Sequence, residues 1–345
     1  MSTGGIQMKV MRLMGNKTVK VVETEKPQPK DDLVVVKIMA STICGTEHTY
    51  YEYDKPIPLD GGTGHEAAGI VEAVDKASHV KVGDRVVIYP TVNENCHHCI
   101  PCLNGEWQRC ENPIPKRSNM GTHVQYMLVP EYVCMPLPDD ISFEAGAMMD
   151  DCLATPYRAI KRLQLAAGEW VFITGAGPIG LGALIISKFK GARVIIVDTN
   201  DYRLEKAKEI GADYVFNPLN CDVKKEVKAI TGKRRCQVSI DCSGAAAAQV
   251  QCLEVLGGGG RMAFLGIKSD ATTINPWKHL QNKEITVIGS WAGTPQDHYE
   301  LCAMVQAGME PEKMITHKFK LDDADEAFRT FFSGKSCKTM LYPWE

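Results

Sequence analysis

The chain has 345 residues, of which 44% are hydrophobic and 23% are charged, and its formal net charge is −3. Because one domain usually holds roughly 100–200 residues, this length predicts two domains. A net charge this small gives no strong field for nucleic acid or anionic membrane, so we expect a small-molecule partner.

The N-terminal segment MSTGGIQMKV has no apolar core of the kind that a signal peptide needs, so we expect a cytoplasmic protein. The stretch 170–187 carries no charge and reaches the ~18 residues that suggest a membrane helix. It contains four glycines and a proline, which favour a buried strand, a glycine turn and the start of a helix. We therefore expect neither a membrane partner nor a nucleic-acid partner.

The predicted elements change in kind along the chain. From about Lys9 to Pro136, short β-branched runs such as DDLVVVKIMA and DRVVIYP are broken by turn-forming residues, which predicts an irregular antiparallel β domain. From Trp170, strands such as VFIT and ARVIIVD alternate with helices such as DYRLEKAKEIGA, which predicts βαβ units and a parallel sheet. Helices near 298–307 and 324–333 and a terminal strand, KTMLYP, are expected to pack back on the first domain.

A glycine-rich turn stands where the first strand of this parallel sheet meets its helix, at Gly175, Gly177, Pro178, Ile179 and Gly180. Glycines let the backbone approach a pyrophosphate, and a helix N-terminus favours its negative charge. The turn lies between VFIT and LGALIISKF, and an acidic residue ends the next strand. This context predicts a dinucleotide-binding Rossmann fold, which is a doubly wound parallel α/β sheet.

Asp198 ends the second strand and bears on the choice of cofactor. A carboxylate there accepts hydrogen bonds from the free ribose diol of NAD and repels the 2′-phosphate of NADP, so NAD is the expected cofactor. Two alternatives stay open. Asp198 could instead cap the following helix, and Arg203 could either tolerate a phosphate or lie exposed on that helix.

Four cysteines gather in the segment ENCHHCIPCLNGEWQRC, at Cys96, Cys99, Cys102 and Cys110. Four thiolates at this spacing suit tetrahedral Zn²⁺, and a site with all four positions filled leaves no room for substrate. A structural zinc lobe at residues 93–112 is therefore predicted. In a cytosolic chain, disulfide bonds among these cysteines are the weaker alternative.

A second set of metal-binding side chains is spread along the sequence, at Cys44, His65, Glu66, Asp151 and Cys152. A catalytic zinc uses about three protein ligands and leaves one position for water or substrate. Cys44 and His65 supply two ligands. Asp151 and Cys152 compete to be the third, and Glu66 could either bind the metal or support it from outside.

Several motifs in this order resemble the zinc-containing medium-chain dehydrogenase/reductase superfamily over nearly the whole chain: Cys44-Gly45-Thr46, Gly64-His65-Glu66, VKVGDRV, the four-cysteine lobe, the TPY segment and the glycine turn. The resemblance implies a GroES-like, β-rich catalytic domain at residues 8–158 and 292–345, interrupted by a Rossmann NAD-binding domain at 159–291. It also implies two zinc ions per chain, one catalytic and one structural, and a homodimer or homotetramer.

The same resemblance implies the ligands of the catalytic zinc. Cys44 and His65 match zinc ligands of the family, and Glu66 matches a glutamate beside the metal. The third ligand varies in the family, and counting back from Tyr157 places it on Asp151, so we prefer Asp151 over the cysteine that follows it. An aspartate there resembles polyol and threonine dehydrogenases more than ethanol-type enzymes.

The resemblance also implies a proton relay. Thr46 matches the family hydroxyl that passes a proton away from the substrate oxygen. Relatives often carry a histidine five residues after the cysteine, where this chain has Thr49. His48, one place earlier, either takes over that role or is a loop histidine. Glu47 occupies an acidic position that would orient the zinc ligands.

We expect a small hydroxylated substrate, a secondary alcohol or polyol, that exchanges a hydride with NAD(H). His123, which stands where many relatives carry an aromatic residue, favours a polyhydroxy or amino-alcohol substrate. A sugar or threonine-type dehydrogenase is the closest alternative. A noncatalytic NAD-binding protein of the same fold is the distant one.

Overall fold

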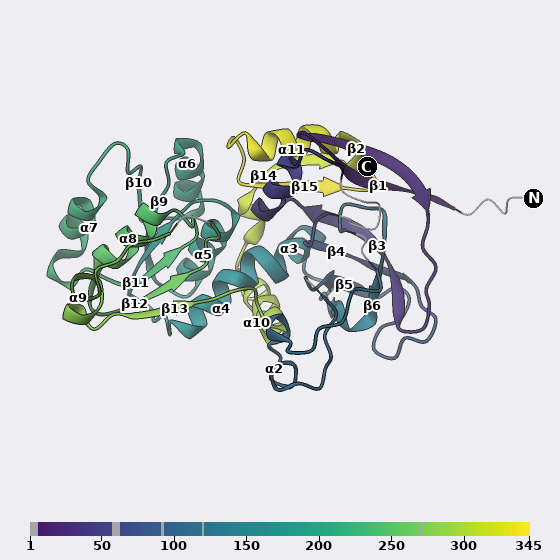
Figure 1. Cartoon of the computed structure of the whole chain (residues 1–345), viewed down its shortest axis with the longest axis horizontal. Coiled ribbons are helices and arrows are strands. Elements are labelled where there is room, and N and C mark those ends of the chain that lie inside the picture. Colours follow the sequence, from purple (N-terminus) through teal and green to yellow (C-terminus); the bar gives the residue numbers. More distant parts are fainter. Residues whose placement is uncertain (1–5, 57–62, 91–92, 119–120, 269–270) are drawn as a thin grey trace, which may run out of the picture. The chain divides into compact units, whose positions relative to one another are not determined.

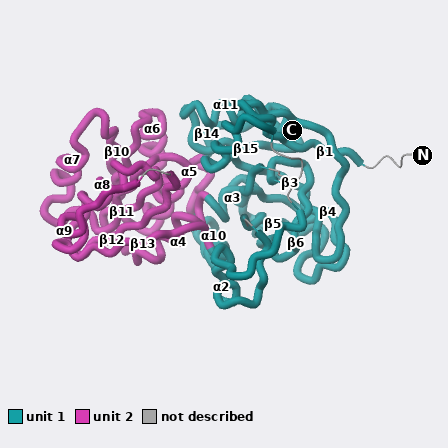
Figure 2. The backbone as a smooth tube through the Cα atoms, in the orientation of Figure 1, with its two compact units in different colours: residues 1–151, 294–308, 315–345 teal, residues 152–293, 309–314 magenta. Residues whose placement is uncertain are grey.

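The computed structural model describes residues 6–56, 63–90, 93–118, 121–268 and 271–345. The chain forms two compact units, coloured separately in Figure 2: residues 1–151, 294–308 and 315–345 build the first, and residues 152–293 and 309–314 build the second. The predicted domains assign 152–158, 292–293 and 309–314 to the first unit, but these residues pack with the second. Close backbone contacts hold them there, since a Cβ added to Gly182 would lie only 2.1 Å from the carbonyl oxygen of Cys152.

The first unit is built on a mostly antiparallel sheet in the order β14-β15-β3-β4-β5-β7, with β6 also paired to β3. Its central strand is β3, which is buried along most of its length because other strands flank it on both sides. The runs DDLVVVKIMA and DRVVIYP form β3 and β5, as predicted. The strands are β3 (Leu33–Thr42), β4 (Ala67–Ala73), β5 (Arg85–Ile88), β6 (Tyr126–Pro130), β7 (Cys134–Pro136), β14 (Ile315–Lys320) and β15 (Lys338–Tyr342).

A separate hairpin of β1 (Gln7–Gly15) and β2 (Thr18–Glu25) joins the first unit. Its apolar side chains pack with those of the C-terminal helix α11, so that residues from both ends of the chain share one core. The helices of this unit are α1 (His48–Glu52), α2 (Ile100–Leu103), α3 (Phe143–Met148), α10 (Pro295–Gln306) and α11 (Ala324–Phe332). Figure 1 shows β1, β2 and α11 side by side.

The C-terminal strand determines which side chains meet at the end of β3. β15 runs antiparallel to β3, with Met340 opposite Thr42, and the Ile43 N–H donates to the carbonyl of Thr339. Continued by two residues, this register brings Lys338 level with Cys44. A residue from the end of the chain thus lies beside the first predicted zinc ligand.

The second unit is a six-stranded parallel sheet in the order β10-β9-β8-β11-β12-β13, which confirms the predicted doubly wound Rossmann sheet. The direction of strand addition reverses between β8 and β11, and in such sheets ligands bind at the carboxyl ends of the strands beside this reversal. The strands are β8 (Trp170–Thr174), β9 (Arg193–Val197), β10 (Tyr214–Phe216), β11 (Cys236–Asp241), β12 (Leu256–Phe264) and β13 (Thr286–Gly289). The helices are α4 (Ala154–Arg162), α5 (Pro178–Phe189), α6 (Asp201–Ile210), α7 (Val223–Thr231), α8 (Ala246–Val255) and α9 (Pro276–His279).

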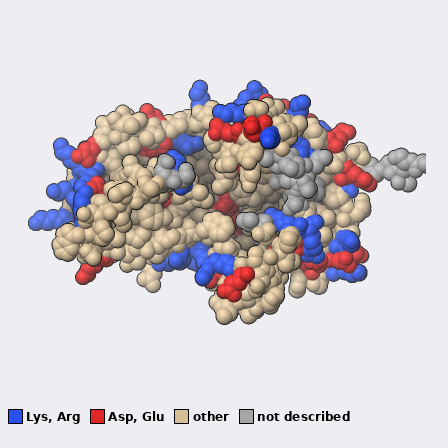
Figure 3. Space-filling view, viewed as in Figure 1, with Lys and Arg blue, Asp and Glu red and all other residues tan. Residues whose placement is uncertain are grey.

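The uncharged stretch 170–187 forms β8, the glycine turn and most of α5, as its glycines and proline predict. Among the described residues, no helix is both long enough and apolar enough to cross a membrane. Basic and acidic side chains occur together over the face of each unit drawn in Figure 3.

Phe328 offers a test of the core shared by the two ends of the first unit. Its side chain is fully buried on α11, with its ring 5.6 Å from that of Tyr51. We predict that F328A lowers the free energy of unfolding of this unit by about 3–5 kcal/mol, because truncation leaves a cavity. Urea denaturation followed by circular dichroism measures the change.

The matched control is F189A in the second unit, where Phe189 is 40% exposed. A side chain that is already largely hydrated has less to lose, so F189A should stay within about 1 kcal/mol of the wild type. Equal destabilisation by the two variants would contradict a core that depends on α11.

Candidate functional site

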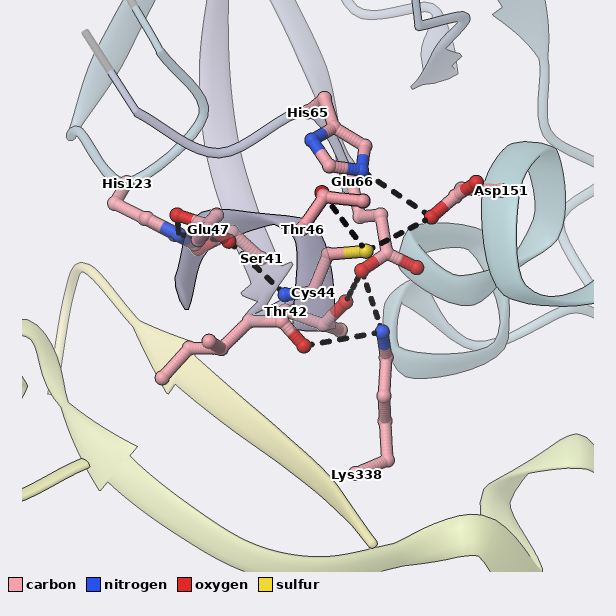
Figure 4. Close-up of polar contacts among 11 residues, drawn as sticks. Ser41, Thr42, Cys44, Thr46, Glu47, His65, Glu66, His123, Asp151 and Lys338 are labelled. Atoms are coloured by element: carbon pink, nitrogen blue, oxygen red, sulfur yellow. Dashed lines mark hydrogen bonds and ion pairs between the residues drawn. The ribbon is translucent and has the colours of Figure 1, made fainter. Parts of the chain in front are cut away.

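Four side chains of the first unit direct one donor atom each toward a common point: Cys44, His65, Glu66 and Asp151. These four atoms all lie within 4.8 Å of one another. Asp151 Oδ2 is 3.3 Å from Cys44 Sγ and 3.2 Å from His65 Nε2 (Figure 4). The predicted ligands, far apart in the sequence, therefore converge.

Three segments position this cluster. Cys44 follows the end of β3, and His65 and Glu66 immediately precede β4. Since β3 and β4 are antiparallel neighbours, the end of one strand lies beside the start of the next. Asp151 comes from the π-helical segment Met149–Leu153, a rare conformation that is frequent at functional sites.

Of the two candidates for the third ligand, the structure brings only Asp151 to the cluster. Asp151 Oδ2 contacts both Cys44 and His65. Cys152 is fully buried, belongs to the second unit and is not among the converging donors. The geometry thus favours the aspartate.

The acidic groups and His65 shift one another's pKa values. Burial opposes ionisation of Asp151, but the hydrogen bond and charge of His65, together with the charge of Lys338 and the contact with Cys44, outweigh burial and lower the pKa of Asp151 to about 2. Burial disfavours a protonated His65, yet the charge of Cys44 and the contact with Asp151 raise the pKa of the imidazole. Burial, together with the charge of Asp151, raises the pKa of the Cys44 thiol. A divalent cation would replace the protons that this negatively charged cluster holds.

Glu66 has two oxygens in different surroundings. Oε2 accepts hydrogen bonds from the Thr42 hydroxyl, at 2.7 Å, and from the ammonium of Lys338. Oε1 is buried and has no hydrogen-bond partner in the part of the chain that the structure describes. Because an unpartnered buried carboxylate oxygen is costly, Oε1 suits a nearby cation. Sulfur, nitrogen and oxygen donors at one point are a set that Zn²⁺ accepts, so these residues fit the metal.

The loop that carries Cys44 is held by Glu47, which is buried. Glu47 Oε1 accepts the Cys44 N–H at 2.9 Å, and its carboxylate lies 3.2 Å from His123 Nε2. Burial opposes the ionised carboxylate, but His123, the charge of His65 and the Cys44 N–H together outweigh burial and lower the pKa of Glu47. The acidic position after the cysteine thus orients the backbone of a predicted zinc ligand.

His123, the polar residue that the sequence analysis connects with a polyhydroxy or amino-alcohol substrate, is enclosed within the first unit. Its side chain is 1% exposed, and Nδ1 is 2.9 Å from the Ser41 hydroxyl while Nε2 faces Glu47. No local pattern around His123 indicates that its side chain will be enclosed, because the enclosing residues come from other segments.

The two predicted relay residues have different surroundings. The Thr46 hydroxyl is 3.4 Å from Cys44 Sγ and therefore lies at the cluster. His48 Nε2 is 3.3 Å from Glu52, its ring packs against Phe332, and half of its side chain is exposed. Neither Glu52 nor Phe332 is a predicted zinc ligand, and the structure does not bring His48 to the cluster.

The four cysteines of the predicted lobe form a second cluster in the first unit, with all four sulfurs within 4.8 Å of one another. The Cys96 N–H donates to Cys110 Sγ, and the Glu111 N–H donates to Cys99 Sγ. The backbone N–H of His98 lowers the pKa of Cys96 to about 6, whereas burial raises that of Cys102 to about 12. Four sulfurs at these separations fit one tetrahedral Zn²⁺ with no position left for substrate.

The glycine turn lies in the second unit at the carboxyl end of β8. Gly175 has a φ of +86°, and a Cβ added to Gly180 would lie only 1.7 Å from the Gly175 carbonyl oxygen. Both positions thus need glycine. Helix α5 starts at Pro178, with Gly177 as its N-cap and no side chain capping it, so its first N–H groups can bind a phosphate. Ile179 lies in the same first turn.

Asp198 lies beside this turn and accepts the Ala176 N–H at 2.7 Å and the Asn200 N–H at 2.8 Å. It does not cap the next helix, because Asn200 is the N-cap of α6 and accepts the Arg203 N–H. Arg203 is half-buried, and its Nη1 lies 3.8 Å from where a Cβ of Gly177 would be. The guanidinium thus flanks the glycine turn, and the interpretation of Arg203 as merely exposed was wrong.

Sequence reasoning missed Lys338 and the pair of His298 and Asp150. Lys338 is fully buried although its strand looks ordinary in the sequence. His298 Nδ1 donates to Asp150 Oδ1 at 2.9 Å, and its Nε2 donates to the Pro136 carbonyl. Burial disfavours the imidazolium, but the charge of Asp150 raises the pKa of His298 to about 11. This pair links α10 to the segment that carries Asp151, the predicted third ligand.

Comparison with known families agrees with this geometry. The model of the alcohol dehydrogenase GroES-like domain matches residues 30–139, and that of the zinc-binding dehydrogenase matches residues 178–307. The chain is similar to the L-threonine 3-dehydrogenase of Deinococcus deserti, with 33% identity covering 94% of this chain and 95% of the relative. The enzyme of the same name from Chromobacterium violaceum is 32% identical and covers 94% of this chain and 96% of itself.

Solved structures of two dehydrogenases share the whole architecture. The 2R,3R-butanediol dehydrogenase of Bacillus subtilis is 26% identical, with a TM-score of 0.85, and covers 97% of this chain and 99% of its own. An E. coli alcohol dehydrogenase in complex with NADH is 26% identical, with a TM-score of 0.84, and covers 98% of this chain and 100% of its own. The chain therefore belongs to the zinc-containing medium-chain dehydrogenase/reductase superfamily of oxidoreductases.

Proposed function

We propose that this protein transfers a hydride between NAD(H) and a small secondary alcohol that carries a polar group on the neighbouring carbon. The observation that carries the proposal is the convergence of a sulfur, an imidazole nitrogen and carboxylate oxygens on one point within a zinc dehydrogenase fold. The chemistry that the two cofactors supply is polarisation of a substrate oxygen by the metal and acceptance of a hydride by the nicotinamide.

In this proposal, Cys44, His65 and Asp151 would hold the catalytic zinc, and Glu66 would lie beside it with one oxygen that has no hydrogen-bond partner among the described residues. The Thr46 hydroxyl, at 3.4 Å from Cys44 Sγ, would take the proton that the substrate hydroxyl loses while passing its own proton onward to the cofactor ribose or to water. His48 would serve the outer relay only after its side chain leaves Glu52. Glu47 keeps the Cys44 loop in place through its backbone hydrogen bond.

For the cofactor, the N-terminus of α5 with Gly175, Gly177 and Gly180 would receive the pyrophosphate. Asp198 is held by two backbone N–H groups and would accept the adenosine ribose hydroxyls of NAD. Arg203, beside Gly177, would face the phosphate side of the turn.

The relatives narrow the substrate class. L-Threonine and 2R,3R-butanediol, which the names of two relatives give, share a secondary hydroxyl next to a carbon that bears an amine or a hydroxyl. We therefore propose a vicinal amino alcohol or diol, which unites the polyol and threonine-type interpretations. A cytoplasmic location suits five cysteines that must be thiolates to bind metal.

NAD⁺ reduction with L-threonine, 2R,3R-butanediol and 2-butanol, followed by the absorbance of NADH, tests the proposal. We predict turnover with a vicinally substituted substrate and much less with 2-butanol. D151N should lower kcat/KM by at least about 100-fold, since even groups that only support a metal ligand contribute roughly 10- to 100-fold.

C152S is the matched control, because its side chain is not among the converging donors. It should retain activity close to that of the wild type. Loss of activity in C152S but not in D151N would make the cysteine the ligand. A wild type that binds NAD and zinc but turns over none of the substrates would favour the noncatalytic alternative.

The structural lobe gives a second prediction. Chelation-resistant zinc should fall from about two to about one ion per chain in C110S, because the lobe loses one of its four thiolates. The apparent Tm should fall as well, since metal binding contributes to the stability of such lobes. C134S, which alters a buried cysteine outside both clusters, should keep both ions.

We also propose a homo-oligomer in which β13 forms part of an interface. β13 is an edge strand, and Val287 on it is 37% exposed. Trp277 and Ile267, in the segment between β12 and β13, are 67% and 72% exposed. An edge strand flanked by exposed apolar side chains is a ready partner for a second copy of the chain.

A lysine on this edge should oppose pairing, so V287K is predicted to shift the protein to a smaller species in sedimentation velocity experiments. V82K is the control, because Val82 is 59% exposed in the first unit. Unchanged sedimentation of V287K would exclude β13 from the interface.

A further inference from the structure

Lys338 is a fully buried lysine at the start of β15. Lysine is almost never buried unless its charge is paired. Its ammonium donates to Glu66 Oε2 and, at 3.3 Å, to the Ile43 carbonyl oxygen. Figure 4 shows the side chain reaching up from β15 to the carboxylate that lies beside Cys44, His65 and Asp151. A positive charge is therefore placed directly behind the proposed metal ligands.

The hydrogen bonds of Glu66 are unevenly divided. Lys338 and Thr42 both donate to Oε2, while Oε1 has no hydrogen-bond partner among the described residues. Glu66 contributes one oxygen to the group of converging donors, so the carboxylate is held through Oε2 beside the proposed metal position.

The charges of this site balance only with Lys338. Ionised Cys44, Asp151 and Glu66 carry three negative charges, and His65 is neutral as a ligand. A zinc ion brings two positive charges, and Lys338 brings the third. Without the lysine, one buried negative charge would remain, and the metal would be its nearest source of compensation.

We propose that Lys338 is a positioning residue that keeps the charge of Glu66 off the catalytic metal and so leaves a coordination position open for substrate. This inference rests on the proposed metal site. When Lys338 neutralises Glu66, the metal is balanced by Cys44 and Asp151 alone. When the lysine charge is lost, Glu66 swings onto the metal and occupies the open position.

A lysine with a purely structural role does not need a carboxylate as its partner, and Lys283 is an example. Lys283 in the second unit is partly buried, and its Nζ donates to the carbonyl oxygens of Leu253, Glu254 and Leu256. Carbonyl oxygens can therefore hold a partly buried lysine in this chain. The carboxylate at Lys338 is an additional feature, and it belongs to the metal-binding group.

The test compares K338Q, K338R and K283Q in the full-length protein with cobalt in place of zinc. Glutamine can still donate to Glu66 and Ile43 but carries no charge, and arginine keeps the charge. The visible bands of Co²⁺ depend on the identity and geometry of its ligands, so they change when a carboxylate oxygen takes the position that water or substrate would otherwise hold. The four-cysteine lobe is the same in every variant, and the difference spectra therefore reflect the Cys44 site.

We expect K338Q to keep its metal content, to show shifted visible bands and to lose roughly 10- to 100-fold in kcat/KM. K338R and K283Q should keep the spectrum of the wild type. The double variant E66Q/K338Q should show the spectrum of E66Q alone, because the amide has no charge to move.

A wild-type spectrum in K338Q would overturn the proposal, as would a spectral change that persists in the E66Q background. Failure to fold in both backgrounds would also overturn it, since the lysine would then serve packing. Folding of K338Q only together with E66Q would support it, because the charge of Glu66 would be what the lysine controls. If the wild type binds no metal at Cys44, the proposed function itself fails. If it binds a metal whose spectrum does not respond to the Lys338 variants, only the proposal about Lys338 fails.

Discussion

Compensation of buried negative charge is the constraint on which the site in the first unit depends. Cys44, Glu66 and Asp151 bring acidic groups to one point, and Cys44 and Glu66 are buried there. Buried ionised groups need partners or a cation, because their hydration has been lost. Lys338 provides one such partner for Glu66, and the sheet pairing that places the lysine there is therefore part of the site.

A second set of buried polar contacts holds the backbone around the ligands. Glu47 and His123 hold the loop after β3 through polar contacts. His298 holds Asp150, the residue before the predicted third ligand. None of these groups is among the converging donors, yet each limits how far a ligand can move. A zinc site of mixed donors gains rigidity in this way, since metal ligands work best when further hydrogen bonds orient them.

Much of the fold could be predicted because its signals are local. The change from short β-branched runs to alternating strands and helices marks the two units, and the helices expected near 298–307 and 324–333 are α10 and α11. The unit boundaries were less accurate, since backbone packing such as that of Cys152 on Gly182 has no signature in the sequence. The GroES-like and zinc-binding dehydrogenase matches confirm the family that the ordered motifs indicate.

The sequence by itself determined the four-cysteine lobe and the glycine turn, because all the residues of each feature lie close together in the chain. It also identified Cys44, His65 and Asp151 through motifs in a familiar order. Only the tertiary structure decided that Asp151 rather than Cys152 joins the cluster, that His123 is enclosed and that His48 faces Glu52. It alone placed Lys338 beside Glu66, because the antiparallel register of β15 on β3 joins residues that are 272 positions apart in the chain.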